Sequence, residues 1–235
     1  MVTMNGWNKE RIHEMLDAYR VSADPDDPKE RKRLVIAQAA AELFAAQGYR
    51  RTNVDQVAAR AGVAKGTVYL YFKKKSEMLL HAVVEEKRRY VGRVVHLFEP
   101  QVPALERLTS WLEAAFSLGV EMPLVSRILR GDRELLTVLY EAGADMGQDF
   151  KVMQIDFVAE LIEEAVGSVG FTRSELRDRA QMLIGLIFFS GSIPDPKVRG
   201  ELSVRRYGEL LTRTIVDGLV LARRSRLERD DSKEV

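Results

Sequence analysis

The sequence predicts an all-α protein in which a small helix-turn-helix domain precedes a larger helical domain. Apolar residues recur at spacings of three and four along most of the 235 residues, as on one face of a helix. Alternating strand-like patterns are not evident, and glycine or proline residues separate the helical stretches. We expect three parts: an N-terminal extension (1–29), a helix-turn-helix domain (30–76) and a second helical domain (77–235).

The N-terminal extension begins with a stretch that suits one amphipathic helix. Apolar residues such as Trp7, Ile12 and Leu16 are interspersed with charges over residues 1–20. Residues 22–28 are acidic and contain two prolines, which predicts a loop or linker that ends this helix.

Two helices and a glycine turn follow the extension. The first runs to about Gln47, where Gly48 is positioned to end it. Asn53 and Gln56 have the spacing of a capping box, which predicts the start of a short second helix. Gly62 can adopt a positive φ angle, so we expect a tight turn there.

The third helix is predicted over Thr67–Phe72. Val68 and Phe72 lie one turn apart, and we assign them, together with Leu70, to the core. Three consecutive lysines follow at residues 73–75, and Ser76 is the expected N-cap of a longer helix that ends near residue 96. Further helices are expected over residues 104–118, 122–141, 148–166, 173–192 and 202–225.

Basic residues concentrate in one part of the chain. Residues 29–93 hold fifteen lysines and arginines against six acidic residues, although the formal net charge of the whole chain is only +1. Such a segment suits a polyanion such as DNA, because basic side chains release counterions from phosphates. Charge alone favours this interpretation and an ordinary solvated helical surface about equally.

Several classes of protein are excluded or disfavoured by the sequence. The chain has no cysteine, which excludes disulfides, thiolate nucleophiles and cysteine-based metal sites. The N-terminus lacks an apolar signal core, and the longest strongly apolar stretch, residues 182–193, is too short to span a bilayer, so we expect a cytoplasmic protein without a membrane partner. The three histidines are scattered, and no phosphate-binding or nucleophile motif is present. We therefore expect no enzyme activity, catalytic residue, metal or cofactor.

The favoured interpretation of this order of elements is a helix-turn-helix and not a plain helical hairpin. Two helices and a glycine turn are followed by a third helix, and basic residues come directly after it. The stretch from Asn53 to Leu80, NVDQVAARAGVAKGTVYLYFKKKSEMLL, resembles the DNA-binding motif of the TetR family of bacterial regulators. This resemblance covers about residues 30–80. It implies a homodimeric transcription regulator that binds a palindromic operator and responds to a small-molecule effector, with repression as the family's usual mode.

The resemblance also implies which residues contact DNA. Lys65, Gly66 and Tyr69 correspond to positions that meet bases. Positions near phosphates are Thr52, Asn53, Thr67, Tyr71 and Lys75, and Lys73 adds charge after the helix. Lysine can donate to guanine acceptors, and tyrosine can touch a thymine methyl group. For Tyr69 and Tyr71, packing between helices is the alternative.

Two features depart from the family's pattern. Ala64 stands where a serine or threonine usually caps the third helix, so a cap worth about 1 kcal/mol is missing. The N-terminal 29 residues are longer than the family's usual arm, and they could steady the helix-turn-helix domain, join the dimer or reach DNA.

The resemblance assigns dimerisation and effector binding to the second domain. Helices at 173–192 and 202–225 are expected to form the dimer interface, with Met182, Leu186, Phe189, Tyr207, Leu211 and Ile215 in it. A largely apolar or aromatic effector is expected between residues 100 and 190, against Trp111, Phe116, Met122, Phe150, Met153, Phe157 and Phe188. Arg127, Arg130 and Asp156 are candidate polar anchors. For every residue in these sets, ordinary core packing is the alternative.

Overall fold

The computed structural model describes residues 27–99, 101–142, 148–167 and 171–231. Within these ranges the side chains of 91, 98, 148–154 and 226–231 are not described. The predicted helix at 1–20 and most of the predicted linker at 22–28 lie outside the described residues.

All regular secondary structure in the described residues is helical, and they contain no strand, which confirms the predicted fold class. The longer helices are α2 (Pro28–Gln47), α3 (Val54–Ala61), α4 (Lys65–Tyr71), α5 (Lys75–Val94), α6 (Ala104–Phe116), α8 (Pro123–Leu129), α9 (Arg133–Glu141), α10 (Gln148–Val166), α11 (Arg173–Phe189) and α13 (Val204–Asp231). Single turns are η1 (Val95–Phe98), α7 (Leu118–Glu121), η2 (Ser190–Ser192) and α12 (Pro196–Arg199).

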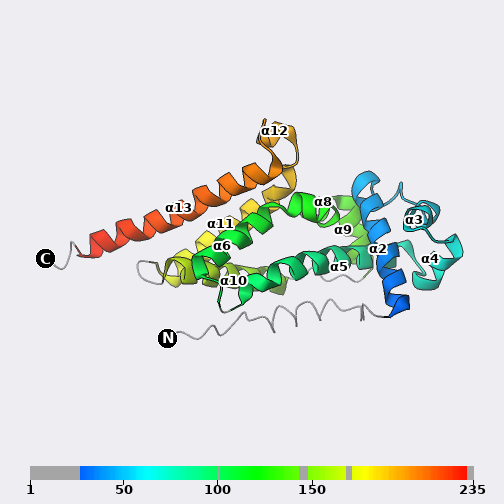
Figure 1. Cartoon of the computed structure of the whole chain (residues 1–235), viewed down its shortest axis with the longest axis horizontal. Helices are drawn as coiled ribbons and strands as arrows, with labels where there is room; N and C mark the ends of the chain where they lie inside the picture. The colour runs from blue at the N-terminus through cyan, green and yellow to red at the C-terminus, as the bar shows by residue number, and fades with distance from the viewer. Residues whose placement is uncertain (1–26, 100, 143–147, 168–170, 232–235) are drawn as a thin grey trace. The chain divides into compact units, whose positions relative to one another are not determined.

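The described chain forms two compact units. The head unit comprises residues 27–93 and 121–142, and the body unit comprises residues 94–120, 148–167 and 171–231. The head unit thus holds α8 and α9 in addition to the helix-turn-helix. Figure 1 shows α8 beside α2 within this unit.

Local capping signals determine where the head helices begin and end. Asp27 accepts a hydrogen bond from the amide of Lys29 at the start of α2, and Gly48 ends that helix with φ = 89°. Asn53 and Gln56 form the predicted capping box of α3, and Gly62 follows with φ = 66°. The structure thus confirms the helix end at Gly48, the capping box and the turn at Gly62. Each of these features depends on residues only a few positions apart.

Two predicted helix boundaries in the head unit are wrong. The helix expected at 122–141 is divided into α8 and α9, because Gly131 adopts φ = 81° and Asp132 caps α9 by accepting from the amide of Leu135. Ser76 is not an N-cap, since α5 already begins at Lys75. The carboxylate of Glu77 instead accepts from the amide of Lys73 just before this helix.

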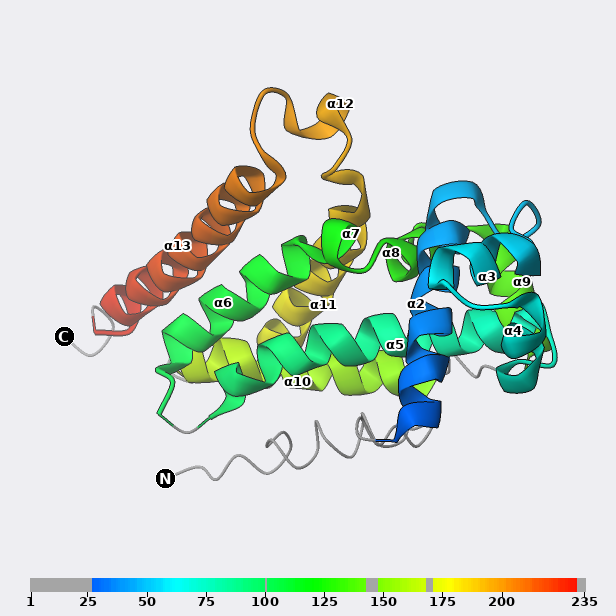
Figure 2. The same cartoon turned by 45° about the vertical axis from the view of Figure 1, so that its right-hand side comes forward.

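In the body unit, α6, α10, α11 and α13 surround one apolar core (Figure 2). Its most buried members include Leu108, Phe116, Ile162 and Leu183. Buried Arg107 joins several segments around it: the guanidinium donates to the carbonyls of residues 97 and 102 and to the Glu164 carboxylate at 2.7 Å. In the described part of the chain, no helix has the length and apolarity to cross a membrane.

Candidate DNA-binding surface and effector region

Helix α4 exposes one face and buries the other. Lys65, Gly66, Tyr69 and Leu70 are exposed, whereas Val68 is fully buried and Thr67 and Tyr71 are half-buried. At 100° per residue the four exposed positions share one side of the helix. This exposed set, which we call the outward face of α4, contains all three residues expected to meet bases.

The assignment of Leu70 to the core is wrong. Its side chain is 75% exposed, more than the 46% of Tyr69 on the same face. The predicted burial of Val68 and Phe72 is confirmed, because these two residues lie one turn apart on the opposite side. An apolar side chain beside Gly66 and Tyr69 adds a group that can contact a thymine methyl in the major groove.

Lys65 is held by an acidic neighbour. Its ammonium donates to the carboxylate of Asp55 on α3 at 2.9 Å, and both side chains are more than half exposed. The hydrogen bond and the charge of Asp55 raise the pKa of Lys65 above its ordinary value. The lysine that is predicted to contact bases is therefore paired with Asp55 in this structure.

Thr52 and Lys75 are engaged inside the head unit. The Thr52 hydroxyl is buried and donates to the carbonyl of Gly48 at 2.8 Å. The Lys75 ammonium donates to the carbonyls of Tyr49 and Thr52 at 2.9 and 3.0 Å, and it lies over the Tyr49 ring. Burial lowers the pKa of Lys75. Both residues thus fix the segment between α2 and α3. Contact of either residue with a phosphate stays a prediction.

The other predicted phosphate contacts lie nearer to solvent. Asn53 is exposed but uses its side-chain oxygen to cap α3, accepting from the amide of Gln56 at 2.9 Å. Lys73 is exposed, and its ammonium lies 3.4 Å from the carbonyl of Tyr69.

The structure brings some of the predicted effector residues together. Trp111 and Phe157 meet edge to face with ring centroids 5.9 Å apart, and Phe116 is buried in the body core. Phe188 is exposed. The side chains of Phe150 and Met153 lie outside the described residues.

The remaining candidates around the effector region have other surroundings. Met122 is buried within the head unit, where Arg130 is exposed. Asp156 forms an ion pair with Arg177 in the body unit.

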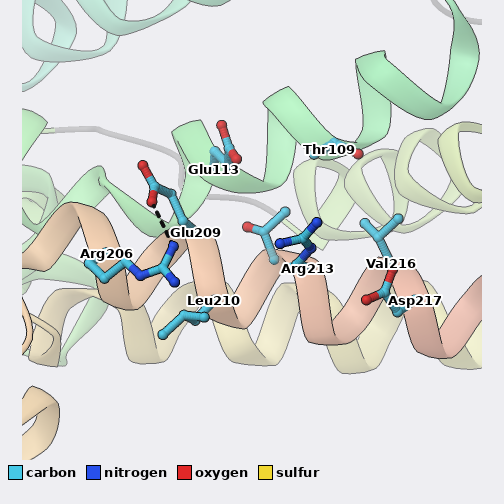
Figure 3. Close-up of a pocket in the computed structure, with 9 residues that line it drawn as sticks. Thr109, Glu113, Arg206, Glu209, Leu210, Arg213, Val216 and Asp217 are labelled. Atoms are coloured by element: carbon cyan, nitrogen blue, oxygen red, sulfur yellow. Dashed lines mark hydrogen bonds and ion pairs between the residues drawn. The ribbon is translucent and has the colours of Figure 1, made fainter.

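A groove of about 370 Å³ in the body unit lies elsewhere, between α6 and α13. Thr109 and Glu113 reach it from α6, opposite charged side chains of α13 (Figure 3). In the close-up Arg206 and Glu209 form an ion pair along the groove. None of the predicted effector residues lines this groove.

The two helices expected to dimerise present different amounts of apolar surface. On α11, Met182 and Phe189 are exposed and Leu186 is half-buried. On α13, Tyr207, Leu211 and Ile215 are half-buried and pack against the body core. Among the described side chains of α13, the large apolar ones that are exposed are instead Leu210 and Leu221.

Helix α8 is bound at both ends by charged side chains of the head unit. At its start, buried Glu86 of α5 accepts from the amides of Leu124 and Val125 at 3.2 and 2.9 Å. Near its end, Arg127 donates to the carbonyls of Phe44 and Ala45 in the last turn of α2 at 2.9 and 3.0 Å. These contacts connect α8 to both α5 and α2.

Residues 36–82 match the family model described as "Bacterial regulatory proteins, tetR family". This segment of the chain is therefore similar to the DNA-binding segment of TetR-family regulators. Among curated relatives the chain is 36% identical, over 90 residues, to the fatty acid metabolism regulator protein of Bacillus subtilis. That alignment covers 38% of this chain and 46% of the relative, so the chain matches only about half of that relative's length.

Solved structures of bacterial regulators share the fold of this chain. The fatty acid degradation regulator FadR of Bacillus halodurans superposes with a TM-score of 0.59 at 21% identity, over 83% of this chain and 96% of that one. FadR of Bacillus subtilis, solved in complex with stearoyl-CoA, gives a TM-score of 0.54 at 23% identity, over 80% and 97% of the two chains.

Proposed function

We propose that this chain is a TetR-family regulator that binds a palindromic operator as a homodimer and represses transcription until a largely apolar effector releases it. The outward face of α4 carries the proposal, because a helix-turn-helix that exposes Lys65, Tyr69 and Leu70 around a glycine can enter a major groove. The concentration of basic residues between 29 and 93 supplies attraction to the phosphates.

Exposed apolar side chains on α11 and α13 support the dimer. Met182, Phe189, Leu210 and Leu221 leave apolar surface on the helices that TetR-like proteins use to pair. A two-fold dimer places two recognition helices about 34 Å apart, one turn of DNA, and so selects a site with inverted half-sites.

Selection from a genomic DNA library at physiological salt tests operator binding. We expect the full chain to enrich an inverted repeat, and Lys65→Ala/Tyr69→Ala to lose it while keeping its fold by circular dichroism. Each lost base contact costs about 1–3 kcal/mol, so the double variant should bind the selected site at least tenfold more weakly. Uniform weak binding that the substitutions leave unchanged would contradict the proposal.

An acyl-coenzyme A is the first effector to test. A regulator of fatty acid metabolism is among the chain's relatives, and one structural neighbour holds stearoyl-CoA. The half-buried pair of Trp111 and Phe157 in the body unit supports this choice, because apolar ligands pack against aromatic side chains. A ligand that favours the conformation unable to bind DNA must weaken operator binding by its differential affinity.

We therefore expect stearoyl-CoA to release the chain from its selected operator in a mobility-shift assay, and coenzyme A alone to leave the complex intact. Release by both compounds indicates nonspecific competition by the charged nucleotide. Release by neither excludes this effector class without affecting the evidence for operator binding.

A further inference from the structure

Asp55 lies beside Lys65 of the outward face of α4 but belongs to the preceding helix, α3. It is the second residue of α3, and its carboxylate is 2.9 Å from the ammonium of Lys65 at the start of α4. More than half of each side chain is exposed, so DNA that contacts Lys65 also approaches a negative charge. An acidic group here opposes binding to the phosphate backbone.

The pair changes what Lys65 can contribute to binding. A lysine without a partner gains affinity on any DNA, because contact with a phosphate releases a condensed counterion. Lys65 gains less from such a contact, because it must give up the carboxylate of Asp55 or bring the anionic phosphate against it. A guanine edge is neutral and offers two acceptors at a fixed position, and the three donors of a lysine allow it to bind that edge and Asp55 together.

We propose that Asp55 is a specificity-determining residue, which restrains Lys65 so that this lysine favours binding where it meets a neutral base acceptor while it keeps its bond to the carboxylate, and not where it meets a phosphate. The inference rests on the proposed operator binding. It concerns how strongly the protein prefers its operator to other DNA sequences, whereas the helix-turn-helix as a whole supplies the affinity for DNA. Asp55 thus acts by weakening the complex with random DNA more than the complex with the operator.

The head unit contains a matched control. Glu42 of α2 forms an ion pair with Arg60 of α3, and these side chains are 42% and 61% exposed. Glu42→Gln therefore removes the same charge from the same unit as Asp55→Asn. Arg60 lies outside the outward face of α4, so its release adds no base contact.

Titrations with the selected operator and with a random-sequence duplex, over a range of salt, test the inference. We expect Asp55→Asn to bind the random duplex about threefold to tenfold more tightly, with a salt slope steeper by about one unit. The operator-to-random affinity ratio should fall in Asp55→Asn and stay unchanged in Glu42→Gln. In a Lys65→Ala background, Asp55→Asn should have a smaller effect, because only the direct repulsion between the carboxylate and the phosphates is then removed.

Three results would overturn the inference. The first is unchanged random-DNA affinity in Asp55→Asn with weaker operator binding, which would make Asp55 a direct base contact, for example to a cytosine amino group. The second is an equal loss of discrimination in Glu42→Gln, which would indicate a general charge effect. The third is an undiminished effect without Lys65. Failure of the proposed function is seen separately, as failure of the wild-type chain to enrich any operator.

Discussion

Arg127→Met is expected to lower the free energy of unfolding by about 3 kcal/mol, the cost of breaking a largely buried ion pair. The Arg127 side chain is 24% exposed, and its guanidinium donates to Asp132 as well as to the carbonyls of Phe44 and Ala45. Methionine keeps most of the apolar stem but leaves two carbonyls and a carboxylate without these donors. Urea unfolding followed by circular dichroism measures the loss.

Arg205→Met is the matched control, because Arg205 is also paired with a carboxylate, that of Glu209, but is 90% exposed. Water and salt screen such an exposed pair, so this variant should lose much less stability. Equal losses in the two variants would show that the contacts of Arg127 with α2 add nothing to the stability of the fold.

The loss in Arg127→Met should also depend on pH. Burial alone raises the pKa of Asp132, but the hydrogen bonds from Leu135 and Arg127 outweigh burial and hold that pKa below its ordinary value. The stabilisation from this carboxylate is therefore complete above about pH 4 and is lost as pH falls through the folded-state pKa. The difference between wild type and variant should shrink in acid, and a constant difference would contradict this explanation.

Features encoded by neighbouring residues were predictable from the sequence. The capping box of Asn53 and Gln56 and the turn at Gly62 each depend on a few consecutive positions. The same holds for the order of the three helices of the helix-turn-helix domain, α2 to α4. The assignment of Leu70 failed because hydrophobicity alone does not show which side of a seven-residue helix is buried. The exposure of its neighbours Gly66 and Tyr69 identifies that side only in the folded structure.

The contacts that hold α8 had no local signal. Arg127 meets carbonyls 82 and 83 residues earlier in the chain, and Glu86 meets amides 38 and 39 residues later. No spacing rule connects residues so far apart, and a charged residue in a helix usually faces solvent. The pairing of Lys65 with Asp55 also required the structure, because the turn between their helices sets the direction of both side chains.

Glu86→Ala is expected to lower the free energy of unfolding by about 3 kcal/mol, because the amides of Leu124 and Val125 both lose a buried acceptor. The control is Glu85→Ala in the same helix. Glu85 is also mostly buried, but its partners Arg88 and Arg89 are exposed enough for water to replace it, so a loss near 1 kcal/mol is expected. Equal losses would contradict a special role for the α8 amides.

Glu86→Gln separates the charge of Glu86 from its shape. Burial raises the pKa of Glu86 above its ordinary value, although the two amides and the charge of Arg89 act in the opposite direction. A raised pKa means that the folded protein holds this proton more tightly, so the associated stability is complete below about pH 4 and is lost as pH rises through the folded-state pKa. Glutamine does not titrate, and the stability advantage of wild type over Glu86→Gln should therefore be larger at pH 4 than at pH 7. An advantage that grows toward neutral pH would show instead that the two amides outweigh burial and that α8 is held by an ionised carboxylate whose pKa is lowered.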